Sequence, residues 1–291
     1  AQILGQETRH HHAQAVVHVA GLVDLAHRRI DQRVAGAALA PGGRLNWETK
    51  LPGLAEWARV RDWRLTMLAK LPNVQIFRES RMGPGDIEEL NPDHTVLATG
   101  SRWRRDGVGV VEIAPRAFPN ALTPDDVFAG ATVTGPVVIY DDEHYFMAGA
   151  LAEKLARAGH AVTLVTPYPQ VSGWTIYTDE QGFVQERLMS LGVTLLPQHG
   201  ITEQGRDNAR ATCLTTGQSH DLPCETLILV TGRLPDDQLW TALQGRPNLA
   251  RVGDCLTPSS IADAVYSAHR FARLLGEPDL PPRRERATLK G

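Results

Sequence analysis

Cysteine is scarce in this sequence, and its placement argues against two kinds of site. Three cysteines occur among 291 residues, at positions 213, 224 and 255. They form no C-x-x-C pair and no metal-ligand spacing, and an odd number argues against a disulfide framework. A run of three histidines, His10 to His12, has no second cluster and is typical of solvated surface. We therefore expect no redox dithiol and no metal site, and the cysteine usage fits a reducing cytoplasm.

Long apolar runs and an excess of one charge are also missing. No stretch approaches the length that spans a bilayer, and no secretory signal is visible. The formal net charge is −3, which gives no general attraction to nucleic acid or to membranes. The dense basic run at Arg283, Arg284, Arg286 and Lys290 is typical of a solvated terminus. We expect a cytoplasmic protein with neither nucleic acid nor membrane as a partner.

Alternating strand and helix patterns are what the sequence does contain. Residues 137–166, "VVIYDDEHYFMAGALAEKLARAGHAVTLVT", read as strand, turn, helix and strand, and residues 179–197 read as a further helix and strand. Such alternation indicates a parallel sheet and the α/β class. Residues 199–231 read as three or four short strands, which we expect to form a β-meander over one face.

The turn at residues 141–146 lacks the glycines that a dinucleotide-binding turn requires. In such a unit, glycines let the backbone approach the pyrophosphate, and the helix N-terminus supplies N–H donors. Here the glycine positions fall near Glu143, Tyr145 and Ala148, beside Asp141 and Asp142. Two like charges about 4 Å apart repel by roughly 4 kcal/mol at an effective dielectric of 20. We predict no ordinary NAD(P) binding, whether the turn is simply polar or is a former nucleotide site now closed.

Four separated segments occur together, in the same order, in one known family. They are "LPGLAEWARVRDWRL", "VLATGSRWRRDGVG", "GPVVIYDDEHYFMAGALAEKLARAGHAVTLVT" and "GDCLTPSSIADAVYSAHRFAR". Over residues 41–277 the chain resembles the C-terminal half of the trimethylamine dehydrogenase family. That family includes dimethylamine and histamine dehydrogenases and related N-demethylases of the NADH:flavin oxidoreductase class, and an acidic, glycine-poor turn is typical of it.

The resemblance implies a fold of two domains. We expect an α/β chain with two Rossmann-like domains of the glutathione-reductase type, with parallel sheets and a β-meander. Residues 41–130 plus 247–278 would form an FAD- or ADP-binding-like domain, and residues 131–246 a vestigial NAD(P)-binding-like domain. Residues 1–40 would be an atypical N-terminal segment and residues 279–291 a tail.

The resemblance also implies cofactors and partners that this chain would not hold itself. Family members carry a TIM barrel with FMN and a cysteine-ligated 4Fe–4S cluster, where the amine is oxidised, and pass electrons to an electron-transferring flavoprotein. This chain has no barrel and no cluster-cysteine run, and residues 1–40 contain no G-x-G-x-x-G. We therefore expect a fragment that supports amine oxidation on a missing barrel domain, inactive alone and homo-oligomeric in its full-length form.

Nine residues are candidates for contacts to ADP or FAD at the first domain, and none is assigned a catalytic role. Each matches a family position beside the nucleotide, although each could equally serve a plain turn or helix cap. They are Gly42, Gly43, Arg44, Thr99, Gly100, Gly253, Asp254, Ser260 and Ile261.

Two other functions stay open at this point. The first is an autonomous NAD(P)H:flavin oxidoreductase, against which the missing glycines and the missing C-x-x-C argue. The second is a non-catalytic module for scaffolding or interaction, in which Trp174 and Tyr177 would pack either in the local core or against the absent barrel.

Overall fold

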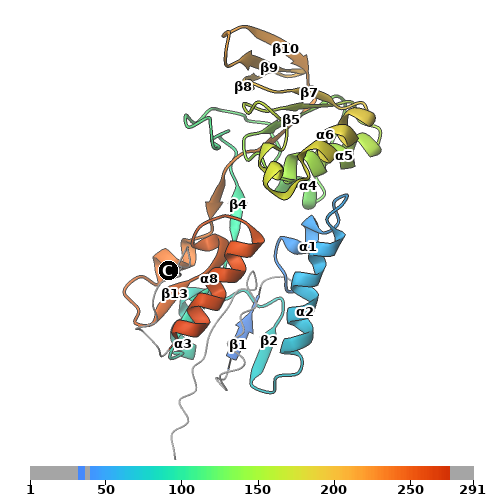
Figure 1. Cartoon of the computed structure of the whole chain (residues 1–291). Coiled ribbons are helices and arrows are strands. Elements are labelled where there is room, and N and C mark those ends of the chain that lie inside the picture. Colours follow the sequence, from blue (N-terminus) through green and yellow to red (C-terminus); the bar gives the residue numbers. More distant parts are fainter. Residues whose placement is uncertain (1–31, 37–39, 276–291) are drawn as a thin grey trace, which may run out of the picture. The chain divides into compact units, whose positions relative to one another are not determined.

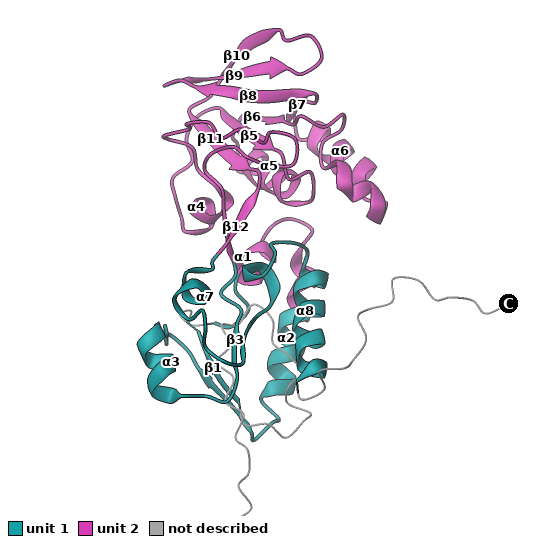
Figure 2. Ribbon diagram, turned by 90° about the vertical axis from the view of Figure 1, so that its left-hand side faces the viewer, with its two compact units in different colours: residues 1–43, 60–100, 236–291 teal, residues 44–59, 101–235 magenta. Residues whose placement is uncertain are grey.

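The computed structural model describes residues 32–36 and 40–275 (Figure 1). The histidine run, the basic tail and most of the atypical N-terminal segment lie outside this part of the chain. The described residues divide into two compact units (Figure 2). Unit 1 takes its residues from 1–43, 60–100 and 236–291, and unit 2 consists of 44–59 and 101–235.

Unit 2 is built on a four-stranded sheet in the order β11-β5-β6-β7, in which every pairing is parallel. Its strands are Val137–Asp141 (β5), Val162–Val165 (β6), Thr194–Leu196 (β7) and Thr226–Val230 (β11). The α-helices Met147–Arg157 (α5) and Gln181–Ser190 (α6) and the short 3-10 helix Gly173–Thr178 (η3) connect them. This confirms the predicted α/β alternation with a parallel sheet.

The two faces of this sheet have different covers, which explains why β5 and β11 are apolar throughout. Val137 and Ile139 pack with α5, whereas Val138 and Tyr140 pack with the antiparallel sheet of β8, β9 and β10. Those three strands are His199–Gln204, Asn208–Cys213 and Ser219–Pro223. They pair as consecutive antiparallel neighbours, so the predicted β-meander is present and covers one face.

Short elements complete unit 2. The helix α4 (Pro124–Phe128) begins at a capping box, in which Thr123 and Asp126 satisfy each other's backbone N–H groups. Strand β4 (Ser101–Trp103) pairs antiparallel with β12 (Arg233–Pro235). The helix α1 (Leu45–Glu48) and the 3-10 helix η2 (Ala55–Trp57) also belong to this unit.

Unit 1 contains two parallel strand pairs. Strand β1 (Gln32–Ala35) pairs with β2 (Val74–Phe77), and β3 (Thr95–Leu97) pairs with β13 (Leu249–Arg251). Valine and alanine side chains of these strands pack with those of the long helix α8 (Ile261–Leu274) in one apolar cluster. The remaining elements are α2 (Ala58–Leu68, which begins in unit 2), α3 (Pro84–Leu90), α7 (Gln238–Ala242) and η4 (Gly253–Cys255).

The limits of the two units differ from the domain limits that the sequence suggested. Residues 101–130 were expected in the first domain, yet they belong to unit 2. The reason is local packing, because Leu122 N–H donates to Leu227 and Leu229 N–H donates to Leu122 at the edge of the unit 2 sheet. Within the described residues, no helix is long and apolar enough to cross a membrane.

Candidate functional site

The acidic turn after β5 is buried rather than exposed. Asp141, Asp142 and His144 are each 0% exposed. The Asp141 carboxylate accepts hydrogen bonds from the backbone N–H groups of Glu143, at 3.2 Å, and His144, at 2.9 Å. This bonding holds His144 at a φ of 66°, a left-handed conformation uncommon for residues other than glycine. The turn is thus a tightly bonded internal structure.

The Asp142 carboxylate, directly after β5, is bound by backbone N–H groups of a loop about 30 residues earlier in the chain. It accepts from Val111 N–H, at 3.0 and 3.2 Å to its two oxygens, and from Glu112 N–H at 2.8 Å. Val110 N–H donates to the Asp142 backbone oxygen at 3.0 Å. Gly109 permits this approach, since a Cβ there would overlap the Asp142 side chain. The Asp142 carboxylate is therefore bound by backbone N–H groups in the way that an anionic ligand would be.

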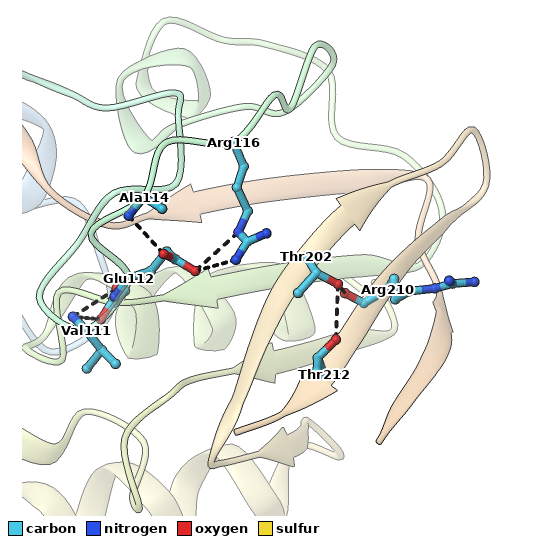
Figure 3. Close-up of polar contacts among 8 residues, drawn as sticks. Val111, Glu112, Ala114, Arg116, Thr202, Arg210 and Thr212 are labelled. Atoms are coloured by element: carbon cyan, nitrogen blue, oxygen red, sulfur yellow. Dashed lines mark hydrogen bonds and ion pairs between the residues drawn. The ribbon is translucent and has the colours of Figure 1, made fainter. Parts of the chain in front are cut away.

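Glu112 secures the loop that delivers these donors. Its carboxylate accepts from Ala114 N–H at 2.9 Å and pairs with the Arg116 guanidinium at 2.7 Å, as Figure 3 shows. The arginine hydrogen bond is the main cause that holds the pKa of Glu112 below its usual range, against an opposing effect of burial. The loop is therefore fixed from both sides.

His144 links this turn to the next part of unit 2. Its Nε2 lies 3.0 Å from an Asp142 carboxylate oxygen, and its Nδ1 lies 3.3 Å from the Thr166 hydroxyl. Its ring centroid is 4.8 Å from that of Tyr168, and its backbone oxygen accepts from Trp174 N–H at 2.9 Å. The histidine is thus surrounded on every side by unit 2 side chains.

Burial raises the pKa of two carboxyls in the turn. The pKa of Asp141 rises to about 6, chiefly through desolvation, which His144 and the backbone N–H groups oppose. The pKa of Glu143 rises to about 7 for the same first reason, opposed by Arg233 and Arg44. The Glu143 carboxylate lies 3.8 Å from the Arg233 guanidinium, and both side chains are largely buried. Near neutral pH the turn therefore holds protons that solvent-exposed carboxyls would have lost.

Two backbone N–H donors beside the acidic turn are engaged within unit 2. The N–H groups of Val111 and Glu112 donate to the Asp142 carboxylate, so they are not available to a phosphate. The sequence indicated that Asp141, Asp142 and Glu143 would repel a phosphate. The burial of Asp142 and its hydrogen bonds from Val111 and Glu112 could not be predicted from the sequence. Gly109, in the stretch "DGVGVVE", was the one signal of a close backbone approach.

In unit 1, the structure brings four predicted residues together at one sheet edge. Strands β3 and β13 run parallel, so Thr99-Gly100 and Gly253-Asp254 follow neighbouring strand ends. Gly100 and Gly253 have φ values of 87° and 67°, and a Cβ on Gly100 would meet no atom within 4 Å. Space therefore lies beside this backbone. The Thr99 hydroxyl donates to the Asp236 backbone oxygen.

Asp254, Ser260 and Ile261 lie at the start of α8. Asp254 is 7% exposed and accepts from Ser259 N–H at 3.3 Å. Ser260 is the N-cap of this helix, and its hydroxyl accepts from Asp263 N–H at 3.2 Å. Ile261 is the first helical residue. A 14-residue helix thus directs its N-terminal dipole toward the end of η4.

The remaining three predicted residues, Gly42, Gly43 and Arg44, are divided between the two units. Gly42 and Gly43 have φ values of 129° and 54°, which suits a glycine turn at the edge of unit 1. Arg44 belongs to unit 2, where it pairs with Glu48 at 2.8 Å and lies 5.4 Å from the ring centroid of Trp103. The structure does not show Arg44 grouped with the other eight residues, and its guanidinium is engaged with a carboxylate.

The sequence and the fold of this chain are similar to those of known amine dehydrogenases. Residues 122–210 match the family model described as "OYE-like second alpha/beta domain". Dimethylamine dehydrogenase from Hyphomicrobium sp. (strain x) is 34% identical over 276 residues, which are 82% of this chain and 37% of that protein. The structure of histamine dehydrogenase from Rhizobium sp. 4-9 superposes with a TM-score of 0.87 at 35% identity. The chain belongs to the trimethylamine/dimethylamine dehydrogenase family.

The chain spans less than half the length of these amine dehydrogenases. The histamine dehydrogenase match covers 96% of this chain and 47% of that one. A second solved relative, 6-hydroxypseudooxynicotine amine oxidase from Pseudomonas geniculata N1, is 32% identical with a TM-score of 0.84 and is covered to 42%. Thioredoxin reductase from T. acidophilum, at 14% identity and a TM-score of 0.60, shares the fold over 97% of its length.

Proposed function

We propose that this chain is the C-terminal, nucleotide-binding-like portion of a flavin-dependent amine dehydrogenase or N-demethylase. In this account its two units are Rossmann-like domains of the glutathione-reductase type. The first binds ADP or FAD, and the second is vestigial and serves structure. The support comes from the dehydrogenase relatives and from the likeness of the fold to thioredoxin reductase.

The closed turn of unit 2 carries this proposal. An enzyme that drew electrons from NAD(P)H would need a pyrophosphate site at the end of β5, where this chain keeps the buried Asp142 carboxylate. An amine dehydrogenase that obtains its electrons from the substrate needs no such site. The glycine-poor turn with its buried Asp142 carboxylate therefore favours the amine dehydrogenase over an autonomous NAD(P)H:flavin reductase.

The redox groups of the proposed enzyme are assigned to the part outside the matched region. FMN would supply the oxidation of a methylated amine, and a 4Fe–4S cluster would pass electrons to an electron-transferring flavoprotein. The three cysteines of this chain do not fit such a cluster, because they are fewer than four and form no C-x-x-C pair, and the described residues hold no group of three or more His, Cys, Asp or Glu side chains that could bind a metal. This chain contributes binding and support rather than the chemical step.

Unit 1 provides residues that fit an adenine nucleotide. The open backbone at Gly100 allows close approach, and the α8 N-terminus with Ser260 and Ile261 favours a phosphate. Asp254, buried at the strand end, is suited to accept from a sugar hydroxyl. Gly42 and Gly43 would form the turn beside the ribose, while Arg44, engaged with Glu48, is the least suited of the nine.

Calorimetric titration of the purified chain with ADP and with FAD tests this assignment. The chain should bind one of them with a Kd in the micromolar range. Gly100→Asp, which places a negative charge in the open space, should weaken binding at least tenfold. Gly217→Asp is the matched control, because Gly217 has a φ of 71° and open surroundings but lies in the unit 2 meander. No binding of either ligand would refute the nucleotide assignment, and oxidation of NADH by the chain would favour the reductase.

A further inference from the structure

The segment η3 of unit 2 is a rigid platform that presents apolar side chains to solvent. Within the segment, Gly173 and Thr175 are buried. Val171 and Ser172, directly before it, are buried as well. The Thr175 hydroxyl donates to the Ser172 backbone oxygen at 2.7 Å. A Cβ on Gly173 would overlap the Tyr168 ring, so the backbone lies directly against unit 2. The platform therefore has a fixed conformation before anything binds to it.

Four large side chains project outward from this platform and the helix that follows it. Tyr177 is 86% exposed, Phe183 66%, Ile176 55% and Trp174 40%. Aromatic side chains that are rigidly held and exposed in a group are typical of protein–protein hot spots. We name these four residues the η3 patch.

The closed turn supports this patch. Trp174 N–H donates to the His144 backbone oxygen, and the His144 and Trp174 rings lie 6.2 Å apart. Through its contact with Asp142, His144 is connected to the loop that carries Val111, 46% exposed, and Ile113, 80% exposed. The turn that closes the former nucleotide position thus fixes two exposed apolar segments at once.

We propose that the η3 patch is a docking surface for the portion of the dehydrogenase that this chain does not contain, and that the Asp141–His144 turn is its foundation. The occupant follows from the relatives, in which more than half of the polypeptide has no counterpart here. An apolar surface that is exposed in this chain is a natural contact for that remainder. The inference rests on the proposed function as part of a larger enzyme.

The charges around the patch define the partner's surface. Asp179 and Glu180 are exposed at the end of η3, and Glu186 is exposed on α6. A complementary partner presents an apolar centre with a lysine- or arginine-rich rim. The same acidic rim disfavours a second copy of this chain as the occupant, because like charges would face each other.

A binding measurement with two matched variants tests the proposal. The probe is the segment of the Rhizobium sp. 4-9 histamine dehydrogenase that this chain does not cover, with its fold checked by circular dichroism. The intact chain should bind it, and Tyr177→Ser should weaken binding at least about tenfold. Leu214→Ser, which changes a residue 54% exposed on the meander side, should leave binding unchanged. No complex at about 100 μM of each protein, or equal loss in both variants, would overturn the proposal.

A second readout avoids dependence on the probe's own folding. In a full-length chimera, residues 32–275 replace the aligned region of the histamine dehydrogenase. Tyr177 and Trp174 should be protected from hydroxyl-radical oxidation there relative to the isolated chain, and equal oxidation would contradict docking. Sedimentation of the isolated chain identifies the competing occupant, since a dimer abolished by Tyr177→Ser would replace this proposal with self-association. ADP titration of the same variant should be unchanged, which separates failure of docking from failure of nucleotide binding.

Discussion

The imidazole Nε2 of His144 lies 3.0 Å from a carboxylate oxygen of Asp142, and both side chains are 0% exposed. This pair lies directly after strand β5, in the turn that leads to helix α5. Buried charges are tolerated in proteins when they are paired and hydrogen-bonded. Asp142 meets that condition with the N–H groups of Val111 and Glu112, and this explains how an acidic turn is stable inside a fold of this type.

Removal of the Asp142 carboxylate should destabilise unit 2. Asp142→Ala leaves the two N–H donors and His144 without their partner, so the free energy of unfolding should fall by about 3 kcal/mol. Urea denaturation followed by circular dichroism measures this loss. Asp221→Asn, which alters an exposed ion pair with Arg210 on the meander, is the control and should cost less than about 1 kcal/mol. Equal losses in the two variants would show that Asp142 is not the anchor of the turn.

The close approach at Gly109 should make that position intolerant of a side chain. Gly109→Ala places a Cβ against the Asp142 carboxylate, and relief of this overlap should cost about 1–3 kcal/mol of stability. Gly182→Ala is the matched control, because Gly182 lies in α6 with no atom within 4 Å of a Cβ. That variant should be neutral or up to about 1 kcal/mol more stable, since alanine favours helices. Thermal unfolding of both variants tests the difference.

The raised pKa values predict that stability declines as the pH approaches neutrality from below. In the folded chain the pKa of Asp141 is about 6 and that of Glu143 about 7, above their ordinary values of 3.8 and 4.5. The folded state therefore binds these protons more tightly than the unfolded state. Their stabilisation is complete below about pH 4 and is lost as the pH rises to about 7.

Glu143→Gln separates this effect from other titrations. In the variant, the free energy of unfolding should no longer show the part of the decline that Glu143 causes between about pH 4.5 and pH 7, which is worth roughly 3 kcal/mol at most. At pH 8 the variant should be more stable than the parent chain. Urea midpoints measured across this range provide the test. A parent chain whose stability rises steadily from pH 4.5 to pH 7 would contradict the buried, protonated state.

The cap of α8 offers a test in unit 1. Ser260→Ala removes the hydroxyl that accepts from Asp263 N–H, and should cost about 1 kcal/mol. Ser259→Ala is the matched control, since the Ser259 hydroxyl donates to the Asp263 carboxylate at 2.7 Å, whereas Ser260 is the N-cap residue. A smaller loss is therefore expected there. Hydrogen exchange of the first turn of α8 reports on the helix directly, and equal exchange in both variants would contradict the cap.

The elements that the sequence predicted well are those with a strong local pattern. The strand, turn, helix and strand expected in residues 137–166 are present as β5, α5 and β6, and the meander expected in residues 199–231 is present as β8, β9 and β10. Their apolar period or turn residues are contained in the segment itself. The four-residue helix α1 and the 3-10 helix η3 have no such pattern, and they form because neighbouring parts of unit 2 hold them.

From the sequence, we could predict only what the turn does not bind. The missing glycines and the three acidic residues at 141–143 indicated that a dinucleotide would not bind in the usual way. The partners of Asp142 could not be found from the sequence, because Val111 lies 31 positions away and contributes a backbone N–H that any residue would offer. Burial then decides whether such carboxyls repel a ligand from the surface or stabilise the interior. That property depends on the tertiary packing.

The central claim is that unit 2 is closed to dinucleotides by its own carboxylate. Calorimetric titration of NADH into the chain already saturated with ADP tests it most directly, because ADP occupies the site proposed in unit 1. We predict no further binding heat, with the ADP-saturated Asp221→Asn variant as a control that behaves identically. A second binding event with a micromolar Kd, lost when Tyr145 or Asp142 is replaced, would contradict the account and show that the turn opens for a nicotinamide cofactor.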